Sequence, residues 1–395
     1  MTISGKVVLK QGREQSVLRK HPWIFSGGIA STGGNLGDGD WVEVCTDKGQ
    51  TLAYGHYQQG SITVRILSFG PSQPDRHFYV SKLNDALQLR HAAGLPTSAT
   101  NAFRLVHGEG DGLPGLIIDY YDGVSVVQAH SYGMHNDREL IAKALLDVLG
   151  TSLHTVYYKS RATLPGKVRE TPADGYLSGM GVVPHIILEH QHKFYVDWEE
   201  GQKTGFFLDQ RENRKLLADF SNGKNVLNTF CYTGGFSVYA LKADARLVHS
   251  VDASEKAIEL TRKNIALNCF DPETHACTAT DTFEFLKNKE AFYDVIVLDP
   301  PAFAKHRDSR HQAVKGYQRL NTEAMKVIRR GGILFTFSCS QVVDRQLFYD
   351  TVVSAAIQAG RDVKVLHHLT QPADHPVSMS HPEGEYLKGL VLYVV

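Results

Sequence analysis

Cys339 combines the residue type and the position of a catalytic nucleophile. It follows an apolar run in the segment GGILFTFSCSQ, and the flanking Ser338 and Ser340 suggest an exposed strand end. A thiolate here could add to carbon 6 of a pyrimidine, so that carbon 5 takes a methyl group from a sulfonium donor. Because free thiols ionise near a pKa of ~8.5, we expect positive neighbours that lower the pKa of Cys339. A structural, buried cysteine is the alternative.

The segment DPPAF, Asp299–Phe303, directly follows the apolar stretch Val295–Leu298. Pro300 and Pro301 stiffen the backbone and remove two N–H donors where the chain would enter a cleft. We therefore expect Asp299 to act in catalysis, facing a planar group opposite a cofactor, and we expect Asp299 and Pro300 to contact that cofactor. A simple proline stop after a strand is the structural alternative.

A glycine turn, Gly234-Gly235, follows an apolar strand in the segment NVLNTFCYTGGFS and opens a helix. Open α/β sheets bind ligands at the carboxyl ends of their strands, and glycine permits a close approach of backbone to ligand. The spacing is not GxGxxG and no GK[ST] follows, so a nucleotide pyrophosphate is disfavoured. A plain strand-to-helix turn is the alternative.

Two aspartates follow in positions that suit an adenosine-bearing cofactor. Asp252 closes the strand LVHSVD and could accept both ribose hydroxyls, and Asp281 is a candidate for the adenine amino group. Strand-end aspartates also cap helices, so both have a structural interpretation, at helices beginning near Ser254 and Thr282.

From about residue 190 strands and helices alternate regularly, which predicts a parallel, doubly wound α/β sheet. The last two strands have no helix between them and predict an antiparallel edge, as in methyltransferases rather than dinucleotide oxidoreductases. The expected strands are Asn225–Asn228, Leu247–Asp252, Asp294–Asp299, Ile333–Ser338, Val363–Leu369 and Leu387–Val395, and the expected helices are Phe236–Lys242, Glu255–Asn268, Thr282–Lys289, Val314–Ile328 and Arg345–Ala359.

The preceding sequence predicts two further domains, so that the boundaries are 1–72, 73–189 and 190–395. Short strands between glycine turns predict a small barrel or sandwich in the first domain. A mixed α/β pattern predicts a linker domain in the second. The expected elements are the strands Lys6–Lys10, Trp41–Cys45, Thr51–Tyr57, Ser61–Ser68, Val124–His130 and Val156–Lys159, the helices Phe78–Ala93 and Asp137–Leu149, and one extended run, Arg104–Tyr121.

The composition describes an ordinary globular protein. The 395 residues include 42 Lys and Arg against 42 Asp and Glu, so the formal net charge is zero and a globally basic nucleic-acid binder is excluded. No apolar stretch reaches the ~18 residues of a membrane span, and the start lacks a secretory signal. Five cysteines without CxxC spacing favour free thiols in a reducing, cytoplasmic compartment.

Local clusters of basic residues nevertheless suit phosphate contacts. The alternative for each is a solvated helix face. The strongest cluster, with eight basic and two acidic residues between Ala302 and Arg330, begins at the mouth of the predicted cleft. It includes Lys305, Arg307, Arg310 and Lys315; two others contain Lys159, Arg161, Lys167 and Arg169, and Lys6, Lys10, Arg13, Arg19 and Lys20. The histidines lack the spacing of metal ligands, so no metal is expected.

Taken together, the chain resembles bacterial 23S ribosomal RNA cytosine-carbon-5 methyltransferases that carry an N-terminal PUA domain. The resemblance covers almost the whole length and rests on long segments: KQGREQSVLRKHPWIFSGGI, RLVHGEGDGLPGLIID, KTGFFLDQRENR, NTFCYTGGFS, DPPAF, FSCS and ADHP…PEGEYLKG. It implies a PUA-like RNA-binding domain, a central α/β linker domain and a class I methyltransferase domain. The fold of a class I methyltransferase is a doubly wound, mostly parallel sheet with an antiparallel terminal strand. The resemblance also implies S-adenosylmethionine as cofactor.

The resemblance also assigns roles to residues. Cys339 would be the nucleophile. The cofactor contacts would be Phe230, Thr233, Gly234, Gly235, Asp252, Asp281, Asp299, Pro300 and Gln210. The RNA contacts would be Lys203, Arg211, Lys305, Arg307, Arg310, Lys315, Arg19 and Lys20. Lys203, Thr204, Gln210 and Arg211 resemble a lid.

One departure from related enzymes leaves alternatives open. Many RNA cytosine-carbon-5 methyltransferases have a second cysteine after the motif-IV proline, where this chain has Ala302. Another base or water would then remove the carbon-5 proton, or the methyl group would go elsewhere, such as to an exocyclic amine. A non-catalytic RNA-binding module is a further alternative. An apolar edge strand at Leu387–Val395 could also support a homodimer.

Overall fold

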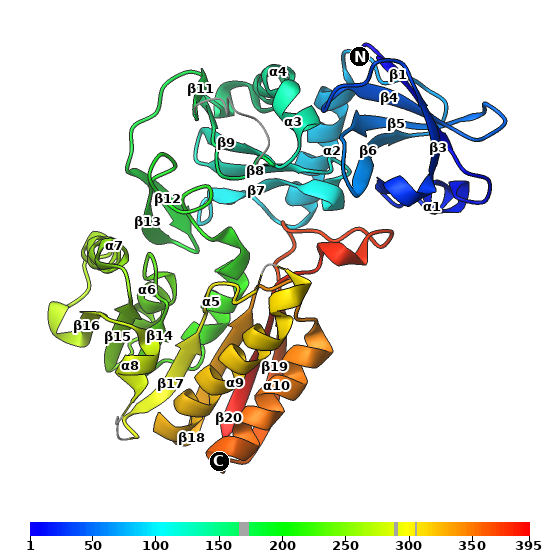
Figure 1. The fold of residues 1–395 in the computed structure, drawn as a ribbon. Helices are drawn as coiled ribbons and strands as arrows, with labels where there is room; N and C mark the ends of the chain where they lie inside the picture. Colours follow the sequence, from blue (N-terminus) through cyan, green and yellow to red (C-terminus); the bar gives the residue numbers. More distant parts are fainter. Residues whose placement is uncertain (166–173, 288–290, 305) are drawn as a thin grey trace. The chain divides into compact units, whose positions relative to one another are not determined.

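The computed structural model describes the chain except residues 166–173, 288–290 and 305, and it forms two compact units (Figure 1). The first unit comprises Met1–Ile187, Val196–Phe206 and Ala373–Gly384. The second comprises Leu188–Tyr195, Phe207–Pro372 and Glu385–Val395. The first two predicted domains thus fall almost entirely in one unit, and the predicted boundaries after residues 72 and 189 stay predictions.

The first unit begins with a six-stranded sheet in the order β2-β6-β5-β4-β1-β3, whose inward valines and isoleucines form a separate core. Four strands match the prediction, whereas β2, β3 and α1 were missed because each of them buries at most one residue. The elements are β1 (Gly5–Leu9), α1 (Glu14–Leu18), β2 (Trp23–Phe25), η1 (Ser26–Gly28), β3 (Ile29–Gly33), β4 (Trp41–Cys45), β5 (Thr51–Tyr57) and β6 (Ile62–Phe69).

A five-stranded sheet in the order β11-β10-β9-β8-β7 follows. The prediction of one extended run over Arg104–Tyr121 is wrong, because a 3₁₀ turn and left-handed Gly112 separate β7 from β8, which then pair antiparallel. The elements are α2 (Phe78–Ala92), β7 (Ala102–His107), η2 (Gly108–Asp111), β8 (Leu116–Tyr121), β9 (Val124–Ala129), α3 (Tyr132–Asn136), α4 (Arg138–Leu149), η3 (Gly150–Ser152), β10 (Thr155–Tyr158) and β11 (Gly175–Ser178).

The second unit is built on a seven-stranded sheet in the order β16-β15-β14-β17-β18-β20-β19. Five strands are parallel, and the order reverses beside β14, which lies between β15 and β17. The strands are β14 (Asn225–Thr229), β15 (Leu247–Asp252), β16 (His275–Ala279), β17 (Tyr293–Leu298), β18 (Ile328–Ser338), β19 (Val363–Thr370) and β20 (Lys388–Val394). A hairpin, β12 (His185–Glu189) and β13 (His192–Val196), precedes them.

The predicted antiparallel ending is confirmed, because β20 pairs antiparallel with both β18 and β19. The prediction that Leu387–Val395 forms the edge of the sheet is wrong. β20 lies between two neighbours, so its backbone groups are already paired and β19 is the edge strand. The argument for a homodimer through the last strand therefore fails.

Helices connect the strands of this unit. Three of them, α8 (Thr282–Leu286), α9 (Arg310–Val327) and α10 (Arg345–Ala359), bury a continuous apolar core against the sheet. No helix of the described chain is long and apolar enough to cross a membrane. The remaining elements are η4 (Leu208–Gln210), α5 (Arg211–Ala218), α6 (Gly235–Lys242), α7 (Glu255–Leu267), η5 (Pro272–Thr274), α8 (Thr282–Leu286), η6 (Arg307–Ser309), α9 (Arg310–Val327), α10 (Arg345–Ala359) and η7 (Pro382–Gly384).

Candidate active site

The predicted site residues of the second unit meet at the carboxyl ends of four adjacent parallel strands. Asp252 ends β15, Asp299 follows β17, and Cys339 follows β18. The register pairs Thr229 with Val251 and with Leu298, so the glycine turn after β14 begins between Asp252 and Asp299. Because this edge is also where the strand order reverses, it is the ligand-binding position of an open α/β sheet.

The turn after β14 is held in a strained shape by the neighbouring strand. Phe230, Tyr232 and Gly234 all have left-handed backbone angles, with φ of 54°, 47° and 73°. The Tyr232 N–H donates to Asp252 Oδ2 at 3.0 Å. Non-glycine residues at positive φ concentrate at functional sites, because packing must overcome their strain. The turn and Asp252 therefore form one preorganised element.

Packing also explains why the two glycines are glycines. A Cβ on Gly234 would lie 2.7 Å from Thr261 Cγ2, and one on Gly235 would lie 2.9 Å from Arg214 Cδ. Arg214 is itself fixed by two hydrogen bonds to the buried Glu189. The carbonyl of Thr233 accepts a hydrogen bond from Asn264 at 2.8 Å, which anchors the turn to α7.

The structural interpretation of Asp252 and Asp281 as helix caps is wrong for the first and right for the second. Ser254, not Asp252, caps α7, which leaves Asp252 to bind the turn and the Ser254 N–H. Asp281 does cap α8, with Oδ1 accepting from the Phe283 and Glu284 N–H groups. The capping interpretation of Asp281 is therefore confirmed, and its adenine contact stays a prediction.

Asp299 is partly buried and accepts a hydrogen bond from Gln210 Nε2 at 3.0 Å. Gln210 is in turn fixed by Asn213, whose side-chain amide donates to Gln210 Oε1 at 2.6 Å. Burial, followed by the negative charge of Asp209, raises the pKa of Asp299 to about 7. Asp299 is therefore a carboxyl group that can gain or lose a proton near neutral pH.

The Cys339 thiol contacts the backbone of the residue that follows Asp299. Its Sγ is 4.0 Å from the carbonyl oxygen of Pro300, and the side chain is partly exposed. Burial, Asp299 and Asp209 raise the pKa of Cys339 to about 12. The expectation of a lowered pKa is wrong for the protein alone, because burial and the two carboxylates outweigh the lowering effect of one positive neighbour, Lys388.

Two residues that the sequence analysis did not single out complete the site. Asp209 accepts a hydrogen bond from Tyr386 through Oδ2, while its buried Oδ1 has no hydrogen-bond partner in the described part of the chain. Lys388 is buried and donates to the carbonyls of Ser340 and Val343 at 2.7 Å each, and burial lowers its pKa to about 8. Both lie in the segments LDQ and YLKG, where the resemblance was the only available signal.

The long basic cluster is not one surface. Because α9 runs back along the sheet for about 27 Å, Arg310 and Lys315 lie at its site end and Arg330 lies beyond its far end. At the far end Arg329 pairs with Asp294 and lines a cavity of about 360 Å³. Lys305 lies outside the described residues, and Arg307 begins η6.

The other predicted RNA contacts differ in exposure. Arg19, Lys20 and Lys203 are exposed. Arg211 is only 2% exposed and bonds Glu212, so a direct phosphate contact by Arg211 is not supported. Thr204, assigned to a lid, is buried and donates to Asp119 at 2.6 Å, which is a structural role. Lys167 and Arg169 lie outside the described residues.

The strand order and this site define a class I methyltransferase fold, and comparisons with known proteins agree. The model of a family described as S-adenosylmethionine-dependent methyltransferase matches residues 103–385, and a PUA-like domain model matches residues 7–69. Proteins named "Ribosomal RNA large subunit methyltransferase I" from Aeromonas hydrophila and Alteromonas mediterranea are 40% and 39% identical, over 99% of both chains in each case.

A solved methyltransferase structure in complex with SAH has the same fold, with a TM-score of 0.85 at 22% identity over 99% of this chain and 100% of that one. The chain therefore belongs to the family of S-adenosylmethionine-dependent methyltransferases with an N-terminal PUA-like domain, together with the ribosomal RNA large subunit methyltransferases I. S-Adenosylmethionine is accordingly its cofactor.

Proposed function

We propose that this protein transfers a methyl group to carbon 5 of a cytosine in the ribosomal RNA of the large subunit (23S) through a covalent adduct with Cys339. The RNA class is taken from the names of the relatives. The observation that carries the chemistry is the Cys339 thiol 4.0 Å from the Pro300 carbonyl, beside a carboxyl group with a pKa of about 7. This substrate would give the protein a cytoplasmic location.

The residues at the sheet edge fit the cofactor. The turn Phe230–Gly235 with its three left-handed residues, and the Asp252 carboxylate joined to it, would hold the methionine and ribose parts. The free carboxyl oxygen of Asp281 would remain for adenine. When bound, S-adenosylmethionine supplies an electrophilic methyl group and leaves as S-adenosylhomocysteine.

We infer that one proton moves between Cys339 and Asp299 during catalysis. Above a pH of about 7 the Asp299 carboxylate can accept the thiol proton while Sγ bonds to carbon 6 of cytosine. The electron pair of the C5–C6 double bond shifts toward N3, where Asp299 returns the proton. Carbon 5 is then nucleophilic and takes the methyl group.

The chain has no second cysteine to assist in removing the carbon-5 proton. Asp209 is our candidate for the base that removes it. Its unpartnered Oδ1 belongs to a carboxylate whose charge acts on both Cys339 and Asp299. In the last step this oxygen would accept the carbon-5 proton. The electron pair of that C–H bond re-forms the double bond as the bond between carbon 6 and Sγ breaks. The proton on N3 then returns through Asp299 to the departing thiolate, which leaves neutral 5-methylcytosine and the Cys339 thiol.

Phe303 favours carbon 5 over the exocyclic amine as the acceptor. An amine methyltransferase with this motif needs an aromatic ring free to stack on the base. The Phe303 ring instead packs on Tyr317, with centroids 4.6 Å apart, and a Cβ on Gly316 would lie 2.8 Å from it. Phe303 is therefore part of the packing of α9.

RNA would be bound by exposed cations of both units. Arg310 and Lys315 lie at the site end of α9. Arg19 and Lys20 follow α1, next to Leu18, which is 57% exposed. Basic side chains beside exposed apolar groups suit phosphate and base contacts respectively.

The proposal is tested with labelled methyl donor and unmodified 23S ribosomal RNA, followed by mass spectrometry of the nucleosides. We expect 5-methylcytosine from the native protein and at least a thousandfold loss of rate in Cys339→Ala. Cys269→Ala, at an exposed cysteine, is the matched control and should retain full activity. RNA containing 5-fluorocytidine should trap a covalent complex only when Cys339 is present.

Each other result points to a specific alternative. An amine-methylated base would indicate transfer to the exocyclic amine, and full activity of Cys339→Ala would remove the nucleophile assignment. Calorimetry that detects no affinity for S-adenosylmethionine would favour a non-catalytic RNA-binding module.

A further inference from the structure

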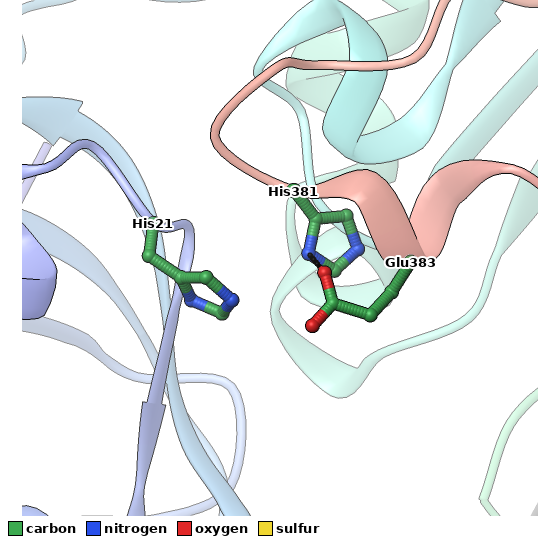
Figure 2. A group of neighbouring side chains, drawn as sticks. All are labelled: His21, His381 and Glu383. Atoms are coloured by element: carbon green, nitrogen blue, oxygen red, sulfur yellow. Dashed lines mark ion pairs between the residues drawn. The ribbon is translucent and has the colours of Figure 1, made fainter.

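A second cluster of potential ligand atoms lies in the first unit and is not used by the proposed reaction. It consists of His21, from the loop before β2, and His381 and Glu383, at η7 in the segment 373–384 (Figure 2). One nitrogen or oxygen from each side chain lies within 4.8 Å of the others. Residues 360 positions apart are thus brought together by the fold.

His381 is the strongest indication that the cluster binds something. The side chain is 2% exposed, and its Nδ1 is buried without a hydrogen-bond partner in the described structure. Glu383 Oε2 lies 3.2 Å from this nitrogen, as an ion pair, without the angle of a hydrogen bond. A buried nitrogen in this state costs stability unless a ligand satisfies it.

His21 is oriented by the backbone in the way that metal-binding histidines are. Its Nδ1 lies 3.1 Å from the Trp23 carbonyl oxygen and accepts from the Trp23 backbone N–H at 3.2 Å, so this residue fixes the ring in either tautomer. The tautomer that donates to the carbonyl oxygen carries its lone pair on Nε2, and binding of a metal ion at Nε2 selects that tautomer. Figure 2 shows a nitrogen of this ring facing the His381 and Glu383 side chains.

Trp23 fixes the second histidine. Its ring packs edge-on against His381 with centroids 4.3 Å apart, and its Nε1 donates to Glu109 at 2.9 Å. Both imidazoles are therefore held by surrounding contacts, while the Glu383 side chain, which is 57% exposed, can rotate.

We propose that His21, His381 and Glu383 bind one divalent transition-metal ion, with Zn²⁺ as the best match. Two imidazole nitrogens and one carboxylate oxygen suit Zn²⁺, and three protein ligands leave one position for water. Zinc bonds of ~2.1 Å require ligand atoms about 3.4 Å apart. His381 Nδ1 and Glu383 Oε2 are already 3.2 Å apart, so the separation that must shorten on binding is the one from His21. The ion would bind residues 373–384 to the six-stranded sheet, and the expectation of no metal is revised accordingly.

The test uses the full-length protein and Co²⁺ as a spectroscopic substitute for Zn²⁺. We expect visible absorption bands of tetrahedral or five-coordinate Co²⁺ at one equivalent, with competition by Zn²⁺. His21→Ala and Glu383→Gln should each weaken binding at least tenfold, because each removes one of three ligands. Both side chains are partly or fully exposed, so these variants should fold. His91→Ala and Glu385→Gln, which alter an exposed histidine and a nearby exposed acid, are the matched controls and should bind normally.

Metal binding should also raise the melting temperature of the native protein and not that of His21→Ala. Absence of a saturable site, or equal binding by His21→Ala, Glu383→Gln and the controls, would overturn the proposal. Neither readout depends on methyl transfer, so failure here is distinguishable from failure of the proposed function.

Discussion

At the scale of single residues, the Asp299 carboxylate should be required for methyl transfer and should destabilise the folded protein. Its raised pKa means that the folded protein loses stability as the pH rises from about 4 to about 7. Asp299→Asn keeps the acceptor for Gln210 but cannot ionise. We expect this variant to be about 2–4 kcal/mol more stable than the native protein at pH 8, and to lose nearly all activity. Denaturant unfolding at several pH values measures the first effect.

The comparison at low pH is the internal control for Asp299. Near pH 4 the native carboxyl group is protonated, so the stabilities of the two proteins should converge. The activity of the native enzyme should fall as the pH drops through about 7, because Asp299 then cannot accept the thiol proton. A stability difference that does not change with pH would contradict this assignment.

Lys388 is expected to act by positioning Cys339. Lys388→Met removes both hydrogen bonds to the carbonyls of Ser340 and Val343, which lie one and four residues after the nucleophile. We expect kcat to fall at least tenfold and the KM for S-adenosylmethionine to change less than twofold. Lys364→Met, at an exposed lysine on β19, is the matched control. Equal effects of the two substitutions on kcat would argue against positioning.

At the scale of elements, α9 should contribute to RNA binding only through its first half. Reversing Arg310 and Lys315 to Glu should weaken RNA binding at least tenfold and lower its salt dependence, because two phosphate contacts are lost. Lys326→Glu with Arg330→Glu changes the same charge at the far end of the sheet and serves as control. Titration of labelled RNA at several salt concentrations measures both. Equal losses would show a non-specific effect of net charge.

The elements with a strong hydrophobic period were predicted closely from the sequence. The bounds of α10 match the prediction, and the central strands β15 and β17 match within one residue. The strand β16 was missed because all five of its residues are half-buried and it includes no apolar run. Local pattern identifies buried elements well and half-buried edge strands poorly.

The site was predictable only in part, because local sequence pattern indicates residues at the ends of buried strands but not contacts between distant segments. Cys339 and Asp299 could be found because they follow apolar strands whose carboxyl ends must share an edge. Asp209 lies within the short turn η4 and Lys388 begins β20, and their importance depends on contacts that only the folded chain reveals. The raised pKa of Cys339 likewise comes from burial and two carboxylates, which no spacing in the sequence indicates.

At the scale of the whole molecule, the chain passes between its two units after residues 187, 195, 206, 372 and 384. Two segments from later in the sequence, Val196–Phe206 and Ala373–Gly384, are integral to the first unit. Trp198 is fully buried there, Thr204 bonds Asp119, and the Asp374 carboxylate accepts from the Arg104 backbone N–H at 3.0 Å. Truncation at the apparent end of the linker domain would therefore remove part of a core.

A fragment of residues 1–187 should accordingly be much less stable than the same residues in the full protein. It lacks the Trp198 side chain and leaves Asp119 and the Arg104 N–H without these partners. We expect weak near-ultraviolet circular dichroism and a broad, poorly cooperative thermal transition. A sharp transition at the temperature of the full-length protein would show that the later segments are dispensable.

The buried guanidinium of Arg90, which pairs with Asp111, also donates to the backbone carbonyl of Asp374, 284 residues later in the chain. During translation at about 5–20 residues per second, Arg90 would wait roughly 15–60 s for this partner to leave the ribosome. The amino-terminal half thus cannot finish folding before almost the entire polypeptide has been made, so its maturation is set by the pace of synthesis.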